Sequence, residues 1–229
     1  MAFLIIGHRG ASGNAPENTL KSFAEAISDG ANAVELDVRS TKDGKLVVFH
    51  NEKLDKLTGA KGYVKDFTLH EIKGLSIDGE KIPTLEEALE FIHKNVGRKI
   101  EKVLIEIKEP GTESAIIDEI KKLGMEDVAI IISFHEDSLR KSKAIDSKIE
   151  TGFIYASYKD PIGTAKSIGA SYLLPLYRFT HSKDIERAHE NNFKIIVWTV
   201  NGKAEMEEFK RKGVDGIATD YPSILSSLK

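Results

Sequence analysis

The sequence contains no cysteine, which excludes disulfide bonds and thiolate metal sites. Hydrophobic runs such as Val128–Ile132 are far shorter than the roughly 18 residues that a membrane span requires. At the N-terminus, Phe3–Ile6 is too short for the core of a signal peptide, which takes about 7–15 apolar residues. We therefore expect a soluble, cytoplasmic protein without a membrane anchor.

Neither sign of charge dominates. Lys and Arg number 33 against 36 Asp and Glu, a formal net charge of −3, which argues against a nucleic-acid partner held by bulk positive charge.

With 229 residues, 41% of them hydrophobic, the chain can bury a large core and is not disordered. This length suits one α/β barrel, a fold that commonly fills about 200–250 residues. Nothing in the composition predicts an oligomeric state.

From about residue 100 onward, one pattern repeats: an apolar run, a polar turn, an amphipathic stretch and often a closing glycine. Such strands alternating with helices of about ten residues predict βαβ units and a parallel sheet. The predicted strand and helix pairs are 103–108 with 114–123, 128–134 with 137–145, 150–155 with 161–168, 172–177 with 183–190, and 194–200 with 204–212. A final strand at 214–220 precedes a short helix that begins at Pro222.

The first third opens in the same way, with strands at 3–7 and 33–38 around a helix at 17–28. Asp43-Gly44 then signals a hairpin that returns through a strand at 46–50. Counting this return arm gives nine strands, and leaving it outside the ring gives eight, the number that closes a (β/α)8 barrel (TIM barrel). We predict a single catalytic barrel domain over residues 1–229, with a small insertion at about 51–82. Capping boxes at Thr68–Glu71 and Thr84–Glu87 predict two further helix starts.

Several charged residues fall at strand ends. Side chains two apart on a strand share a face, so Glu35 points the same way as Asp37, and Glu106 the same way as Lys108. His8 and Arg9 directly follow the first strand. In a (β/α)8 barrel these positions form the catalytic mouth.

The hairpin decides where His50 lies. A two-residue turn at Asp43-Gly44 places His50 opposite Asp37 on the same face. A bulged three-residue turn shifts the register by one and sends His50 to the other side.

Carboxylates crowded at one mouth repel one another and need a compensating cation. Although Lys108 and Arg9 could provide it, an oxygen-only set such as Glu35, Asp37 and Glu106 better suits one Mg²⁺ or Ca²⁺ ion. With that ion, Arg9 and Lys108 bring the site to about +1, which matches a singly charged phosphodiester. Two histidines near neutral pKa can supply a general base and a general acid.

The ordered motifs resemble those of the glycerophosphodiester phosphodiesterase family over essentially the whole chain. They are His8-Arg9-Gly10, Pro16-Glu-Asn-Thr19, Glu35-Leu-Asp37, Thr41-Lys-Asp-Gly44, Val47-Val-Phe-His50, Ile82-Pro-Thr-Leu-Glu86, Ile105-Glu-Ile-Lys108 and Trp198-Thr-Val-Asn201. The resemblance implies a metal-dependent (β/α)8 barrel that cleaves small-molecule glycerophosphodiesters to sn-glycerol 3-phosphate and an alcohol. It implies Glu35, Asp37 and Glu106 as metal ligands, His8 and His50 as acid and base, and Arg9 and Lys108 on the phosphate.

One position departs from the family pattern: Asn51 follows His50 where the family commonly has aspartate, which bears on how His50 is tuned. Phe134 and Trp198 lie at later strand ends and either fill the barrel or wall the pocket for the glycerol or the alcohol.

The group that attacks the phosphorus is either water or the glycerol 2-hydroxyl. Two alternatives are a lysophospholipase D-like or sphingomyelinase D-like activity on lipids, and a non-catalytic barrel that binds phosphate esters.

Overall fold

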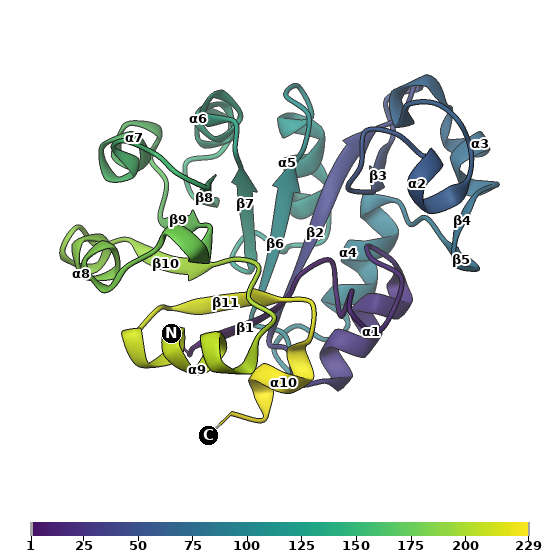
Figure 1. Ribbon diagram of the computed structural model, residues 1–229. Helices are drawn as coiled ribbons and strands as arrows, with labels where there is room; N and C mark the ends of the chain where they lie inside the picture. Colours follow the sequence, from purple (N-terminus) through teal and green to yellow (C-terminus); the bar gives the residue numbers. More distant parts are fainter. Residues whose placement is uncertain (1, 229) are drawn as a thin grey trace.

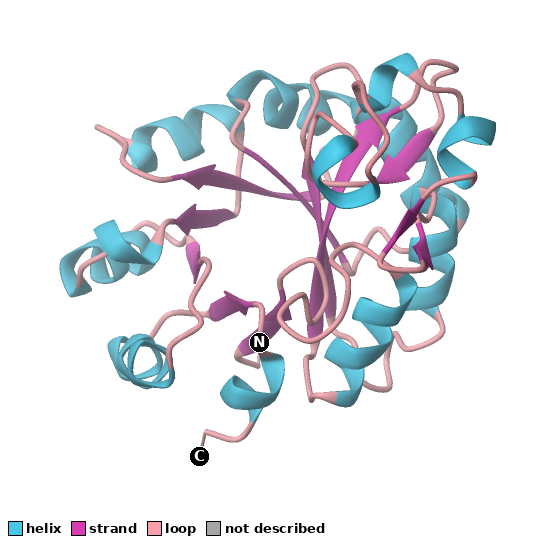
Figure 2. Ribbon diagram, turned by 45° about the vertical axis from the view of Figure 1, so that its right-hand side comes forward, coloured by secondary structure: helices cyan, strands magenta, loops and turns pink. Residues whose placement is uncertain are grey.

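Eight parallel strands form a closed ring at the centre of the structure (Figures 1 and 2). This structure is a computed structural model that describes residues 2–228. The ring closes because β1 pairs in parallel with both β2 and β11. Around the ring the strands are β1 (Leu4–Gly7), β2 (Ala33–Ser40), β6 (Lys102–Ile107), β7 (Ala129–Ser133), β8 (Glu150–Tyr155), β9 (Tyr172–Pro175), β10 (Lys194–Val197) and β11 (Gly216–Thr219). The predicted (β/α)8 barrel is confirmed.

Helices lie outside the ring, between consecutive strands (Figures 1 and 2). None of those within the described residues has the length and hydrophobicity to cross a membrane. Thr84 and Glu87 form the predicted capping box at the start of α4, because each side chain accepts a hydrogen bond from the other residue's amide. The helices are α1 (Leu20–Ser28), α4 (Leu85–His93), α5 (Glu113–Lys122), α6 (Glu136–Ile145), α7 (Pro161–Ile168), α8 (Ser182–Glu190), α9 (Lys203–Lys212) and α10 (Pro222–Ser226), with a 3₁₀ turn, η2 (Tyr177–Phe179), before α8.

The first helix begins later than predicted. It starts at Leu20 rather than Glu17, because the Thr19 side chain accepts a hydrogen bond from the Ser22 amide and caps the helix there. The residues before Thr19 are thereby left to form a loop at the carboxyl end of β1, beside the mouth of the barrel.

The hairpin after β2 uses a three-residue turn rather than the two-residue turn. Its return strand, β3 (Leu46–Val48), lies outside the ring and pairs antiparallel with the end of β2, where Val48 lies opposite Val38. The turn is closed by a 2.9 Å hydrogen bond from the Thr41 amide to the Lys45 carbonyl. Gly44 has φ +72°, the left-handed conformation typical of such three-residue loops.

The predicted pairing of Asp37 with His50 is therefore wrong by one residue. Phe49, not His50, donates its amide to the Asp37 carbonyl at 2.9 Å. Because β3 ends at Val48, His50 lies beyond the regular ladder.

Residues 51–82 form a small layer beside the hairpin. They contain α2 (Asp55–Thr58), the 3₁₀ turn η1 (Val64–Asp66), α3 (Leu69–Lys73) and the short antiparallel pair β4 (Ser76–Ile77) and β5 (Glu80–Lys81). The predicted capping box of Thr68 and Glu71 is present at the start of α3. The segment shares a buried apolar cluster with β3, made of Val47, Phe49, Leu54, Val64, Ile72, Ile77 and Ile82.

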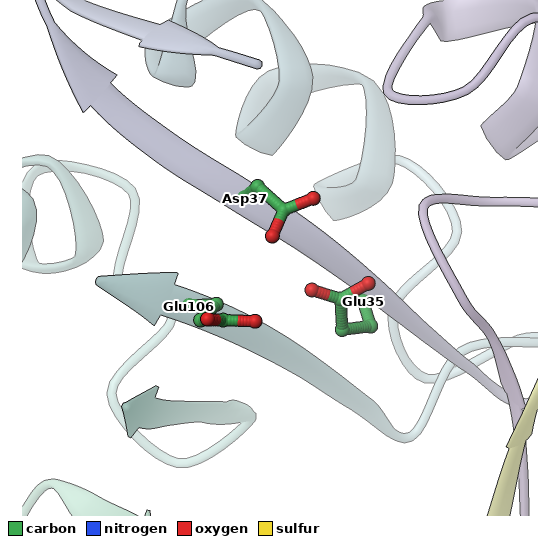
Figure 3. A group of neighbouring side chains, drawn as sticks. All are labelled: Glu35, Asp37 and Glu106. Atoms are coloured by element: carbon green, nitrogen blue, oxygen red, sulfur yellow. The ribbon is translucent and has the colours of Figure 1, made fainter. Parts of the chain in front are cut away.

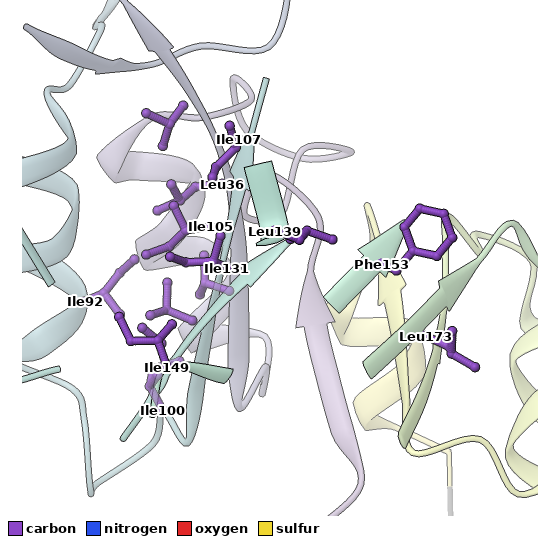
Figure 4. Packing of buried hydrophobic residues seen from close by; sticks show 14 of the residues in the cluster. Leu36, Ile92, Ile100, Ile105, Ile107, Ile131, Leu139, Ile149, Phe153 and Leu173 are labelled. Atoms are coloured by element: carbon purple, nitrogen blue, oxygen red, sulfur yellow. The ribbon is translucent and has the colours of Figure 1, made fainter. Parts of the chain in front are cut away.

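Two hydrophobic layers flank the barrel wall. Figure 4 shows part of the outer layer, where Leu36, Ile105 and Ile131 of the strands pack toward helix residues such as Ile92. The inner layer fills the amino-terminal half of the barrel with side chains such as Ala33 and Leu104. On β2 and β6 the side chains farther along this inner face become charged, with Glu35, Asp37 and Glu106 toward the carboxyl ends of these strands.

Candidate active site

Three carboxylates from two neighbouring strands point toward one another inside the barrel (Figure 3). Glu35 and Asp37 lie on β2, and Glu106 is the register partner of Asp37 on β6. One carboxylate oxygen of each residue lies within 4.8 Å of the others, and all three residues are buried. Anions enclosed this closely repel one another, so the cluster needs a compensating cation.

Burial and mutual repulsion shift the pKa values of this cluster. Burial, with the charges of Asp37 and Glu106, raises the pKa of Glu35 well above its usual range. Burial and the charge of Asp37 likewise raise the pKa of Glu106 to about 7. At Asp37, burial acts in the same direction, but the charges of Arg9 and Lys108 outweigh it and lower the pKa.

The cluster has the donor chemistry of a hard-cation site. The Glu35 Oε1 atom is buried and has no hydrogen-bond partner among the described residues. It belongs to an all-oxygen set with Asp37 and Glu106, and oxygen ligands suit Mg²⁺ and Ca²⁺. These residues therefore fit a divalent cation.

Two basic side chains border the carboxylates. The Arg9 amide donates to Glu35 Oε2 at 2.8 Å, and its Nε atom lies 3.2 Å from Asp37 Oδ2. Lys108 Nζ lies 2.8 Å from Glu106 Oε1 and 3.6 Å from Asp37 Oδ1. Both side chains line the pocket described below, so their positive charge is available to an anionic ligand.

His8 belongs to a hydrogen-bonded network at the end of β11. Its Nδ1 atom lies 2.7 Å from Asp220 Oδ1, which also accepts from the Ser12 hydroxyl at 2.8 Å. Asn201 donates its side-chain amide to Asp220 Oδ2 at 2.6 Å. Burial alone would raise the pKa of Asp220, but these donors and the charge of His8 lower it to about 2. An ionised Asp220 favours a proton on Nδ1 and leaves Nε2 of His8 to act on a ligand.

His50 lines the same pocket, although the register behind its prediction is wrong. Its Nδ1 atom lies 3.0 Å from Asn51 Oδ1. Burial lowers the pKa of His50, and the positive charges of Arg9 and Lys108 lower it further, against the opposing charge of Asp37.

A pocket of about 140 Å³ at the carboxyl ends of the strands brings together all the predicted site residues except Asp37. Its charged half contains the histidines and basic residues, and its other half is apolar. In the apolar half the Phe134 and Trp198 rings pack edge to face at 5.6 Å between centroids. Trp198 donates its indole N–H to the Leu174 carbonyl at 2.8 Å, and Phe134 is 44% exposed at the rim. Both aromatic residues line the pocket, and Trp198 also packs against the apolar cluster inside the barrel. The lining is His8, Arg9, Glu35, His50, Leu104, Glu106, Lys108, Ile132, Phe134, Ile154, Leu174, Trp198 and Ala218.

Sequence reasoning missed several residues that support this site. Asn18, fully buried with φ +58°, donates to Asp37 Oδ2 at 2.8 Å and accepts from the Asp37 amide at 3.2 Å. Asn18 and Asn201 lie within the motifs given above, but the spacing of these motifs does not reveal which residue each asparagine contacts. Asp220 directly follows the last strand, and this position at the mouth of the barrel could have identified it as a site residue. Arg39 shares the inward face of β2 with Asp37, two residues farther on, and that periodicity could have found it.

Comparisons with known proteins agree with this geometry. The model of the glycerophosphoryl diester phosphodiesterase family matches residues 8–224. The chain belongs to this family. A glycerophosphodiester phosphodiesterase of Caldanaerobacter subterraneus is 41% identical over 242 residues, which cover 100% of this chain and 98% of the relative. The chain is therefore an enzyme, a phosphoric diester hydrolase of the glycerophosphodiester phosphodiesterase type.

Solved structures of the family share the fold. A glycerophosphodiester phosphodiesterase from Thermotoga maritima superposes with a TM-score of 0.85 at 32% identity, with 100% of each chain covered. A phosphodiesterase from Oleispira antarctica, solved in complex with its product sn-glycerol-3-phosphate, superposes with a TM-score of 0.87 at 26% identity. That alignment covers 97% of this chain and 94% of the other.

Proposed function

We propose that this enzyme hydrolyses glycerophosphodiesters to sn-glycerol 3-phosphate and an alcohol with the help of one divalent cation, Mg²⁺ or Ca²⁺. The observation that carries the metal requirement is the buried group of Glu35, Asp37 and Glu106, with its unpartnered Glu35 oxygen. When bound there, the ion would polarise the phosphoryl group and offset charge that develops on its oxygens. The product bound to the Oleispira antarctica enzyme supports the identity of the phosphate product.

The basic residues bind and orient the phosphodiester. Arg9 and Lys108 line the pocket with their positive charges next to the carboxylates. Donors fixed in advance around a phosphoryl group stabilise the transition state without further reorganisation. Phe134 and Trp198 wall the opposite side, where they exclude water and contact the carbon atoms of the glycerol or the alcohol.

The two histidines exchange protons with the substrate. His8 and His50 line the same pocket, so one can deprotonate the attacking hydroxyl while the other protonates the leaving alcohol. The attacking hydroxyl belongs to water or to the glycerol 2-position, and in the second case the cyclic phosphate is hydrolysed afterwards. Asp220 holds the His8 ring, and Asn51 contacts the ring of His50.

The test is a coupled assay for glycerol 3-phosphate release from glycerophosphocholine. We expect turnover that disappears after exhaustive chelation and returns with added Mg²⁺ or Ca²⁺. Full activity in the chelated enzyme would contradict the metal site. Absence of glycerol 3-phosphate at any metal concentration would contradict the proposed reaction.

The exposed Phe134 ring and the apolar half of the pocket favour a second candidate, a lysophospholipase D-like activity. A lysolipid would need apolar surface next to the phosphate, which this wall provides. Comparing glycerophosphocholine with lysophosphatidylcholine as substrates separates the two activities.

We further propose that residues 51–82 belong to the same catalytic unit as the barrel. The support is their apolar cluster, which includes Val47 and Phe49 from the hairpin that leads to His50. The cytoplasmic location stays a prediction from the sequence.

A further inference from the structure

His50 lies where the regular structure has ended. The last backbone hydrogen bond from its strand to β2 is made by Phe49, whose amide donates to the Asp37 carbonyl. The His50 carbonyl accepts a hydrogen bond from the Nε atom of Arg39 at 2.8 Å. A side chain therefore holds the main chain of His50 where the sheet does not.

Arg39 is itself held firmly. Its side chain is only 6% exposed, and its Nη1 atom lies 2.7 Å from Glu109 Oε1. The second Glu109 oxygen faces the Ser40 amide at 3.4 Å. Since a guanidinium is planar, the Nε contact to His50 and the Nη1 contact to Glu109 fix each other's direction.

The position of Arg39 separates it from the substrate-binding cations. Arg9 and Lys108 line the pocket, whereas Arg39 is absent from its lining. Its contacts connect the end of β2, the segment after β3 and the segment after β6. The Arg39 guanidinium therefore contacts the main chain of His50 and does not face a ligand in the pocket.

We infer that Arg39, fixed by Glu109, is a positioning residue that sets the place of the His50 imidazole in the pocket. The inference rests on the proposed function, because Arg39 affects catalysis only if His50 takes part in the reaction. A displacement of about 1 Å can cost roughly 100-fold in rate. Arg39→Lys retains the charge but cannot make both contacts in one plane, so it should displace His50 without unpairing Glu109 completely.

The experiment is a double-mutant cycle with glycerophosphocholine. We expect R39K to lower kcat roughly 10- to 100-fold with little change in KM. In the His50→Ala background, R39K should change kcat by less than about twofold, since the group through which it acts is gone. The same fold loss in both backgrounds would overturn the inference. Glu109→Gln provides a second route if R39K folds poorly, and it should show the same dependence on His50.

Two further measurements separate the possible failures. In nuclear magnetic resonance spectra of ¹⁵N-histidine-labelled protein, R39K should shift the His50 ring signals and leave those of His8 in place, which needs no turnover. Unshifted His50 signals in R39K would contradict the inference. If the wild-type enzyme is inactive but R39K still shifts the His50 signals, only the proposed function is contradicted. Lys102→Met is the matched control, because it breaks an ion pair with Glu150 at the opposite end of the barrel and should leave kcat unchanged.

Discussion

Replacing Asp220 with asparagine should lower both kcat and the free energy of unfolding, because it removes one carboxylate that acts on both. Asp220 accepts hydrogen bonds from His8, Ser12 and Asn201, and its pKa is lowered from 3.8 to about 2. In D220N an amide N–H₂ group can face Nδ1 of His8, which would move the ring proton to Nε2 and remove the lone pair that acts on the substrate. Asparagine in place of the aspartate in a serine-protease triad costs about 10⁴-fold in kcat by the same tautomer change. We expect a loss of roughly 10²- to 10⁴-fold here.

The stability effect follows from the same pKa. A carboxylate whose pKa is lower in the folded state stabilises the fold above its unfolded pKa, and this contribution is lost as the pH falls through the folded pKa. The lowering of the Asp220 pKa from 3.8 to about 2 corresponds to roughly 2 kcal/mol of folding free energy at neutral pH. Because the Asp220 side chain is 27% exposed, solvent screening makes this an upper value. The gap between wild type and D220N should shrink to about 1 kcal/mol at pH 3.

The assays are steady-state kinetics at pH 7 and urea unfolding at pH 7 and pH 3. Asp215→Asn is the matched control, since Asp215 also contacts a histidine, 2.9 Å from His189 Nε2, and lies away from the pocket lining. It should leave kcat unchanged. Wild-type kcat in D220N would refute the role of Asp220 in orienting His8. A stability gap that does not shrink at pH 3 would refute the electrostatic explanation.

Two further outcomes are expected. His8→Ala and His50→Ala should each lower kcat by about 10²- to 10⁴-fold while circular dichroism stays unchanged, and near-normal turnover in both variants would end their assignment as acid and base. The metal-free protein should become less stable as the pH rises from about 5 to 8, because Glu35 and Glu106 have raised pKa values and hold more protons when folded. Thermal unfolding in a chelator measures this slope, and added Mg²⁺ or Ca²⁺ should reduce it; a chelated protein with equal stability at both pH values would contradict the repulsion described here.

Much of the fold could be predicted because its signals are local. The alternation of apolar runs and amphipathic stretches predicts the strands and helices to within a few residues, and the capping boxes at Thr68 and Thr84 begin helices as expected. The pattern predicts the helix after β1 three residues too early, because it is Thr19 whose side chain accepts a hydrogen bond from the Ser22 amide and caps α1.

The hairpin shows where local signals end. Asp43-Gly44 correctly indicates a turn, but two- and three-residue turns share that dipeptide, and the choice between them moves the register by one. His50 nevertheless reaches the pocket, since β3 ends before it and Arg39 holds its carbonyl. A strand pairing alone would not predict this position, because it depends on a side chain of the neighbouring strand.

The sequence by itself determined which side chains share a strand face, since alternation is a property of the extended backbone. It thereby placed Glu35 with Asp37 and located Glu106 at a neighbouring strand end. Only the tertiary structure decided the contacts between distant segments, such as His8 with Asp220, 212 residues apart, and Arg39 with Glu109, 70 residues apart. Such pairs depend on how the ring closes and how loops cross its mouth, and no local spacing encodes either.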